Sequence, residues 1–212
     1  MGKQFTALLI ILFSVIFMKP AFNQMTQDSI DAYTESIKKF RTGKNIKLMY
    51  NESTPLTPVQ HKNFKGLNYF DPDTRYRLEG HLVVDQNPET VILRTSTERA
   101  PEYVKYGKIL FELDGEQYEL IAYQSKKLLD VKPDDSTLFI PFRDATSGNE
   151  TYGGGRYVDV ELPASGSAVV IDFNKAYNPY CAYNPGFSCV IPPGENRLPV
   201  RIAAGEKIFG KH

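Results

Sequence analysis

Tryptophan is absent from this 212-residue chain, and the chain has only two cysteines and three histidines. So few thiols and imidazoles disfavour a cysteine and histidine metal cluster, and no histidine lies near the cysteines in sequence. The sequence therefore predicts no metal and no cofactor. The formal net charge is zero, with 25 basic and 25 acidic side chains. No cluster of like charge stands out, and a nucleic-acid partner would require a basic stripe, so we expect none.

The common catalytic and nucleotide-binding motifs are also missing. The chain contains no P-loop, no Gly-x-Ser-x-Gly turn, no His-Glu-x-x-His and no dinucleotide-binding fingerprint. The sequence therefore contains no common motif that identifies a reaction. No internal repeat or low-complexity tract divides the chain, and the length suits one domain over residues 24–212.

Residues 1–23 are typical of a secretory signal peptide. Lys3 gives a positive start, residues 5–18 are almost wholly apolar, and Lys19 and Pro20 end the run. The run is shorter than the roughly 20 residues that a membrane-spanning helix needs. We therefore expect an exported protein, periplasmic or extracellular. Residues 21–23 supply only one of the two small residues of an Ala-x-Ala cleavage site, so an uncleaved membrane anchor is the alternative.

Helical periodicity is confined to residues 28–70, which we expect to form an N-terminal cap. Asp28 is placed to cap a helix over residues 29–42, and Gly43 is placed to end it. A second, short helix is predicted over residues 58–64, between turns. The longer helix is indicated by apolar residues at spacings of three and four: Ile30, Tyr33, Ile37 and Phe40.

From residue 75 onward the apolar residues alternate with a period of two, which is typical of strands. Asp114 and Gly115 form the clearest hairpin signal, because both accept the positive φ of a type I′ turn. About eight strands without intervening helices predict a mainly β fold, an antiparallel barrel or a sandwich-like sheet. The predicted strands span residues 75–84, 91–95, 103–113, 117–123, 137–142, 157–162, 169–173 and 200–203.

The longest irregular stretch between predicted strands is residues 143–156, which ends in three glycines and an arginine. Loops of this length in compact domains are often functional. Arg143 and Arg156 each carry a planar fork suited to a carboxylate or phosphate, and Asp144 and Glu150 add carboxylates. The alternative is a glycine-rich hairpin connection in which Arg143 pairs with Asp144 or Glu150 as a structural contact.

Residues 172–199 contain too many prolines for a helix or a central strand, and too many aromatic rings for a mobile linker. Asp172 and Asn174 share one side of the preceding strand, where a carboxylate can act as a general base or a ligand anchor. Alternatively, both residues hold the Asn-Pro turns that follow. The segment also supplies three tyrosines that we expect to wall a pocket: Tyr177, Tyr180 and Tyr183.

The two cysteines, Cys181 and Cys189, enclose seven residues. In an exported chain a disulfide between them is the expected state. Closing so short a loop contributes about 2 to 3 kcal/mol in the chain-entropy account. A metal site would need further ligands, and none lies nearby in sequence.

Several consecutive motifs resemble the domain-of-unknown-function family numbered 1684, over residues 29–209. The resemblance implies a β-rich domain without an established activity, and it marks the 143–156 loop and the 172–198 segment as family motifs. The family also includes members without an export signal, which leaves a redox or metal role for the cysteine pair open. The motifs are STPL at 53–56, FKGLNYF at 64–70, LFIPFRDATSG at 138–148, ETYGGGRY at 150–157, NPYCAYN at 178–184 and PPGENRL at 192–198.

These observations favour a protein that binds a small polar or anionic ligand between the 143–156 loop and the 172–199 segment. One alternative is a hydrolase-like enzyme with Asp144, Glu150 or Asp172 as general base. The other is a structural or interaction module without a small-molecule site. A membrane partner is expected only if the N-terminal segment stays uncleaved. Convergence of Arg143, Arg156 and Asp172 on an open cavity would separate the first two hypotheses from the third.

Overall fold

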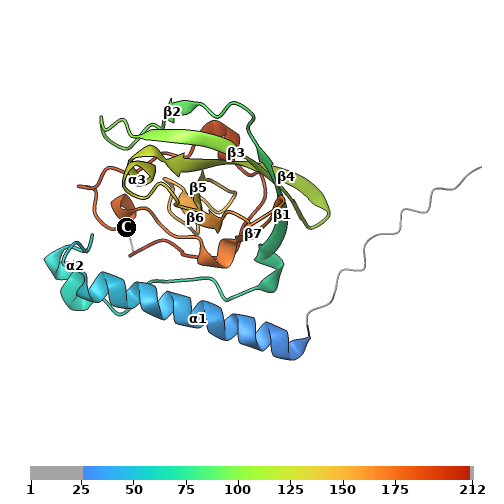
Figure 1. Ribbon diagram of the computed structural model, residues 1–212. Helices are drawn as coiled ribbons and strands as arrows, with labels where there is room; N and C mark the ends of the chain where they lie inside the picture. The colour runs from blue at the N-terminus through green and yellow to red at the C-terminus, as the bar shows by residue number, and fades with distance from the viewer. Residues whose placement is uncertain (1–25, 211–212) are drawn as a thin grey trace, which may run out of the picture.

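The fold was derived from a computed structural model, which describes residues 26–210. Within this range no helix is long and apolar enough to cross a membrane. The predicted signal segment, residues 1–23, lies outside the described residues. The described part begins with a long helix and continues into a curled sheet, and the C-terminal segment returns alongside the helix (Figure 1).

Seven strands form one antiparallel sheet in the order β6-β5-β4-β3-β1-β7, and β2 pairs with β3 beside β1. The hairpin between β3 and β4 turns at Asp114 and Gly115, whose φ angles of 54° and 87° confirm the predicted positive-φ turn. The strands are β1 (Arg77–Val84), β2 (Thr90–Ile92), β3 (Glu102–Leu113), β4 (Glu116–Ser125), β5 (Thr137–Phe142), β6 (Arg156–Glu161) and β7 (Ala168–Asp172).

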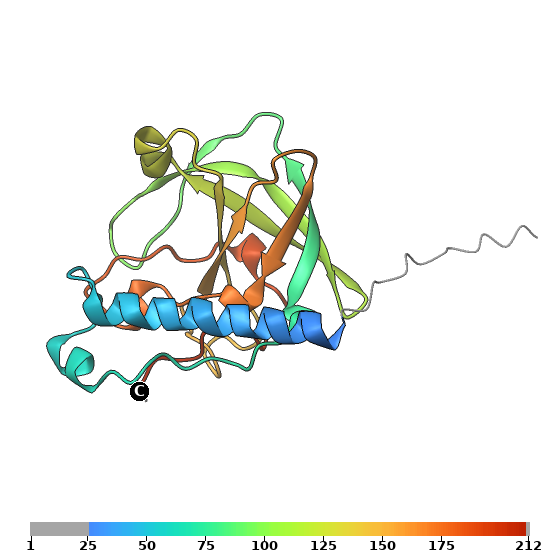
Figure 2. The ribbon, with the colours of Figure 1, turned by 60° about the horizontal axis from the view of Figure 1, so that its bottom comes forward.

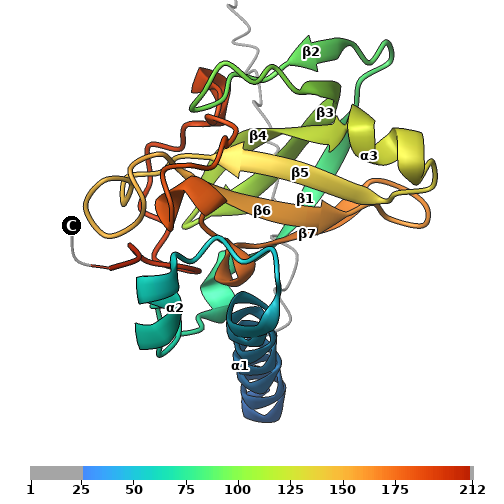
Figure 3. The same ribbon diagram turned by 90° about the vertical axis from the view of Figure 1, so that its left-hand side faces the viewer.

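The sheet curls into a half-barrel that stays open. Its edge strands β6 and β7 lie side by side in Figure 3, but they do not pair along their length. Instead, Tyr157 in β6 forms an isolated bridge with Tyr177, beyond the end of β7. The antiparallel β fold is confirmed, whereas the barrel is not closed. The predicted strand over residues 200–203 does not form, because side chains bond both backbone groups of Ile202: Arg156 donates to its carbonyl, and Asp144 accepts from its amide.

Apolar side chains fill the inside of the curl and also cover part of its outside. The main core includes Ile109, Phe142 and Phe173, none of which is exposed. A second cluster lies on the other face of β4, around Ile121 and Tyr123. Neighbouring residues of β4 therefore enter different clusters, so the strand is buried on both faces.

The helix α1 (Gln27–Tyr50) lies along the end of the sheet where β7 finishes (Figure 2). It is longer than predicted at both ends, since Thr26 and not Asp28 caps its start, and Gly43 lies in its interior. The residues after Gly43 have partners elsewhere in the fold, and Lys44 pairs with Glu206. These contacts outweigh the weak helix propensity of glycine. The short helix α2 (Pro58–Asn63) forms as predicted.

The joint between β4 and β5 is made largely by one side chain. The two strands share a single registered pair, and helix α3 (Lys126–Val131), which the strand pattern did not predict, lies between them in the chain. The fully buried Asn196 accepts from the Ile121 amide at 2.7 Å. It also donates to the Ile121 carbonyl at 2.8 Å and to the Pro141 carbonyl at 2.9 Å. One carboxamide thus replaces missing ladder bonds.

Candidate functional site

The 143–156 loop is held in one conformation by a buried cluster of hydroxyls and one carboxylate. Thr146 donates to Asp144 and shares a 2.8 Å hydrogen bond with the hydroxyl of Thr151. The Thr146 carbonyl also accepts the amides of residues 149, 150 and 151. Thr146 and Thr151 are almost completely buried. The loop is therefore a fixed element of the surface.

Arg156 is completely buried and serves the interior of the protein. Its guanidinium pairs with Asp144 at 3.3 Å, and it donates to the carbonyls of Ile202, Ala204 and Glu206. Burial lowers the pKa of the Arg156 guanidinium, and the Asp144 carboxylate opposes that shift. The three carbonyl contacts join the loop to the C-terminal segment, and the ion pair with Asp144 lies within the loop itself. Arg156 is thus committed to internal partners.

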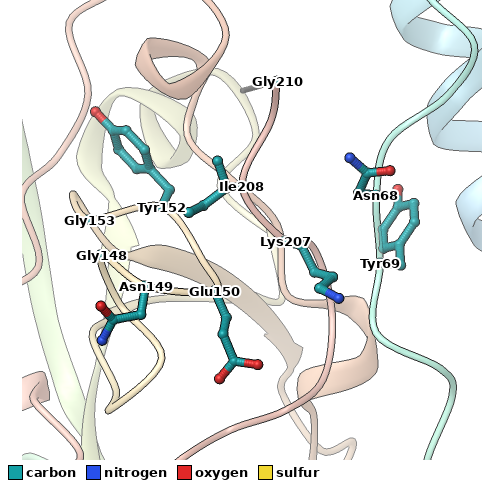
Figure 4. Close-up of a pocket in the computed structure, with 10 residues that line it drawn as sticks. All are labelled: Asn68, Tyr69, Gly148, Asn149, Glu150, Tyr152, Gly153, Lys207, Ile208 and Gly210. Atoms are coloured by element: carbon teal, nitrogen blue, oxygen red, sulfur yellow. The ribbon is translucent and has the colours of Figure 1, made fainter. Parts of the chain in front are cut away.

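An open hollow of about 950 Å³ lies on the outer side of the same loop (Figure 4). The loop supplies one wall, and the segments at residues 68–69 and 207–210 supply the others. Lys207 stands between Glu150 and Tyr69 in this view. The lining residues are Asn68, Tyr69, Gly148, Asn149, Glu150, Tyr152, Gly153, Lys207, Ile208 and Gly210.

The charges around the hollow leave one cation without a carboxylate partner. Arg201 holds Glu150 in a bidentate pair, with N···O distances of 2.8 and 2.7 Å. These hydrogen bonds lower the pKa of Glu150. Lys207 forms no ion pair with any residue that the structure describes, and its ammonium lies 4.9 Å from the centre of the Phe70 ring. The lining therefore carries one ammonium, Lys207, and one carboxylate, Glu150, whose charge Arg201 compensates from outside the lining.

Asp172 and Asn174 lie away from the hollow, next to Tyr33 in the first half of α1. Asp172 accepts the hydroxyl of Tyr33 at 2.8 Å and the amide of Asn174 at 3.1 Å. The carboxamide of Asn174 bonds both the amide and the carbonyl of Asp73. Both residues are buried and tie α1 to the sheet, and neither lines the hollow.

Three tyrosines of the 172–199 segment point in different directions. Tyr180 is half exposed and packs on Phe187, whereas Tyr177 donates to Asp159. Tyr183 donates to the buried Glu206 at 2.5 Å. Glu206 also pairs with Lys44 of α1 at 2.5 Å. Burial lowers the pKa of Lys44, and Glu206 opposes the shift.

Both cysteines are free thiols in the structure, so the expected disulfide is not formed there. Cys181 is half-buried and Cys189 is buried. The amide of Cys181 donates to the sulfur of Cys189 at 3.0 Å. The hydroxyl of Tyr152, which also lines the hollow, lies 3.7 Å from the sulfur of Cys181.

Arg143, Arg156 and Asp172 therefore do not converge on one cavity in the described part of the chain. Asp144 pairs with Arg156 and Glu150 with Arg201, not with Arg143. Sequence reasoning missed Lys207, although the Gly-Glu-Lys at 205–207 lies inside residues 29–209, the range of the family resemblance. It also missed the lining residues Asn68 and Tyr69, which stand inside the FKGLNYF motif.

The fold and the loops define a class of β-rich proteins in which a C-terminal segment and a glycine-rich loop are locked together. The sequence profile of DUF1684, described as a protein of unknown function, matches residues 62–207, and the chain belongs to that family. The solution NMR structure of the uncharacterized protein from gene locus rrnAC0354 of Haloarcula marismortui is similar, with 36% identity and a TM-score of 0.67. The similarity covers 86% of this chain and 97% of that one. No curated protein matches the chain.

Proposed function

We propose that the protein binds a small anionic ligand, bearing a carboxylate or a phosphate, in the hollow beside Lys207. The observation that carries this proposal is the cation without a carboxylate partner, placed in a hollow of about 950 Å³. That volume is within the range of small-molecule sites. The carboxamides of Asn68 and Asn149 and the phenol of Tyr69 are further polar groups along the same walls.

Two features favour binding at a preformed site. The backbone of Lys207 is fixed on both sides, because its amide donates to Asn68 and its carbonyl accepts the Asn178 carboxamide. The facing loop is held by the Thr146 cluster described above. A ligand that meets fixed groups loses less conformational entropy on binding than one that must order them.

A general base is less well supported by the same geometry. Asp144 is paired with Arg156, and Asp172 accepts hydrogen bonds from Tyr33 and Asn174. Glu150 has a pKa below its usual value because Arg201 donates to it. A general base must be free to take a proton from a substrate, whereas all three carboxylates are engaged by these partners.

Thermal unfolding of the purified protein with inorganic phosphate or citrate tests the binding proposal. We expect the melting temperature to rise with anion concentration, because a ligand that binds only the folded state stabilises it. Lys207→Gln should abolish that rise. Lys127→Gln is the matched control, since Lys127 is exposed in α3, away from the hollow. Equal shifts in both variants, or no shift in the wild type, would contradict the proposal and favour a structural role.

We also propose that the protein is exported, because residues 1–23 have the composition of a signal peptide. Mass spectrometry of the protein isolated from its own cells tests this. An intact mass that corresponds to a chain beginning near residue 24 is the expected result. A full-length chain recovered with the membrane would instead support the uncleaved anchor.

A further inference from the structure

The two thiols lie together at the surface of the 172–199 segment, in unequal environments. Cys181 is in the 3-10 turn Tyr180–Ala182 and is half-buried, whereas Cys189 has an exposed fraction of only 8%. The 3.0 Å hydrogen bond from the Cys181 amide to the Cys189 sulfur places the two residues in direct contact. Cys189 is fixed from the other side, because its amide donates to the hydroxyl of Ser96 at 3.1 Å.

The groups around Cys181 favour its thiolate. Hydrogen bonds from Cys189 and then from Tyr152 lower the pKa of Cys181 to about 6, although partial burial opposes the shift. The pKa of Cys189 is raised in turn, because its proton is engaged by Cys181. These hydrogen bonds favour the negative charge at the half-buried sulfur, and a thiolate is the nucleophilic form of cysteine.

We propose that Cys181 and Cys189 form a hydroperoxide-reactive dithiol, in which Cys181 attacks the peroxide and Cys189 resolves the product. Cys181 is assigned the first reaction because it is only half-buried, whereas Cys189 is buried and less open to a reagent from solution. Cys189 is assigned the second reaction because it already contacts Cys181. Reactive cysteines of this kind are typically accessible and placed next to a resolving thiol. Neither sulfur lines the hollow, although Tyr152 contacts Cys181 and also lines it, so the cysteine chemistry does not depend on anion binding.

The chemistry balances in two steps. The Cys181 thiolate attacks one peroxide oxygen, the O–O bond breaks, and the leaving hydroxide or alkoxide takes a proton to give water or an alcohol. Cys181 is then a sulfenic acid, oxidised by two electrons, and the peroxide is reduced. The Cys189 thiol attacks the Cys181 sulfur, the S–O bond breaks, and a second water leaves. The product is the Cys181–Cys189 disulfide, which an external thiol reduces again.

The direct test is to treat the reduced, folded protein with one equivalent of hydrogen peroxide and to map the products by mass spectrometry. We expect a peptide in which Cys181 and Cys189 are joined, with the loss of two hydrogens. In Cys189→Ser the reaction should stop at the sulfenic acid, which dimedone traps on Cys181. Cys181→Ser should give no dimedone adduct. Near-ultraviolet circular dichroism of each variant shows whether it has folded.

Tyr152 is a positioning residue in this scheme, because it acts only through the Cys181 sulfur. Tyr152→Phe should slow the reaction of Cys181 with peroxide by a factor of about 2 to 10, the equivalent of one hydrogen bond. Tyr180→Phe is the matched control, since Tyr180 adjoins Cys181 but its hydroxyl forms no hydrogen bond within residues 26–210. Its rate should equal that of the wild type.

Two results would overturn the proposal. One is a folded wild-type protein whose two thiols both remain unmodified after the peroxide treatment. The other is oxidation that appears only in urea, at the rate of an ordinary exposed cysteine. Both measurements use wild-type protein, so they stand even if a cysteine variant fails to fold.

Discussion

Arg156 is the largest side chain that the fold buries completely, and it carries its charge into the interior. Its partners are Asp144, which is also buried, and three carbonyls of the C-terminal segment. A buried guanidinium is tolerated because this carboxylate and these carbonyls compensate its charge. The residue therefore acts as a joint between the 143–156 loop and residues 202–206, and its loss should affect the whole domain.

We predict that Arg156→Met lowers the free energy of unfolding by about 3 to 5 kcal/mol, because Asp144 is left as an uncompensated buried charge. Urea unfolding measures the difference. Arg201→Met is the control, because that ion pair is solvent-exposed and should change stability by less than about 1 kcal/mol. Similar losses in the two variants would contradict the role given to Arg156.

At the scale of single residues, the sequence located the loop that lines the hollow, but it did not predict which of the polar side chains bond to internal partners. The polarity of Asp172 and Asn174 was visible, but their partner Tyr33 is 139 residues away from Asp172 in the chain. Likewise, Arg156 meets carbonyls about which a sequence pattern says nothing. The choice between a ligand contact and an internal contact depends on such long-range partners.

At the scale of elements, α1 shows how tertiary contacts override a local stop signal. Gly43 would ordinarily end a helix. The helix nevertheless continues to Tyr50, because Lys44 and Leu48 are engaged by the rest of the domain. Gly43 therefore occupies an interior helical position without using the conformational freedom that glycine offers.

This position predicts a stabilising substitution. A Cβ at Gly43 would meet no atom within 4 Å, so Gly43→Ala should raise the free energy of unfolding by about 0.5 to 1 kcal/mol. Thermal or urea unfolding measures it. The contrasting variant is Gly107→Ala, where the new Cβ would lie 2.3 Å from the Val83 carbonyl oxygen and should destabilise the sheet. A destabilised Gly43→Ala protein would show that residue 43 needs glycine for another reason.

Most strands were predictable because alternation and turn residues act over short distances. The predicted strand at 137–142 has the same bounds as β5, and the Asp114-Gly115 hairpin turns as expected. Helix α3 was not predicted, because its six residues are too few to show a helical period. The open barrel could not be predicted either, since strand counts do not say whether β6 and β7 will pair.

At the scale of the whole molecule, the sheet consists of two parts joined by Asn196. One part is built on β3, with β1, β2 and β4 around it, and the other is the β5–β6 hairpin. Between β4 and β5, a single registered strand pair and three side-chain hydrogen bonds connect them. Removing the carboxamide should loosen one part more than the other.

We predict that Asn196→Ala lowers the free energy of unfolding by at least about 3 kcal/mol, because it leaves three buried backbone groups without partners. Hydrogen exchange should become faster in β5 and β6 than in β1 and β3. Asn87→Ala, at an exposed turn, should change neither quantity. Uniform acceleration across all strands would argue that Asn196 does not join two parts of the sheet.

The position of Asn196 near the end of the chain also sets an order in time. Synthesis proceeds from the N-terminus, so the hairpins of β1 to β4 exist before the residues that complete the sheet. The carboxamide at 196 and the carbonyls at 202, 204 and 206 that receive Arg156 are made after these strands. A nascent chain that stops before residue 206 leaves that arginine without its full set of acceptors. The native contacts of Arg156 are thus complete only after translation has passed residue 206.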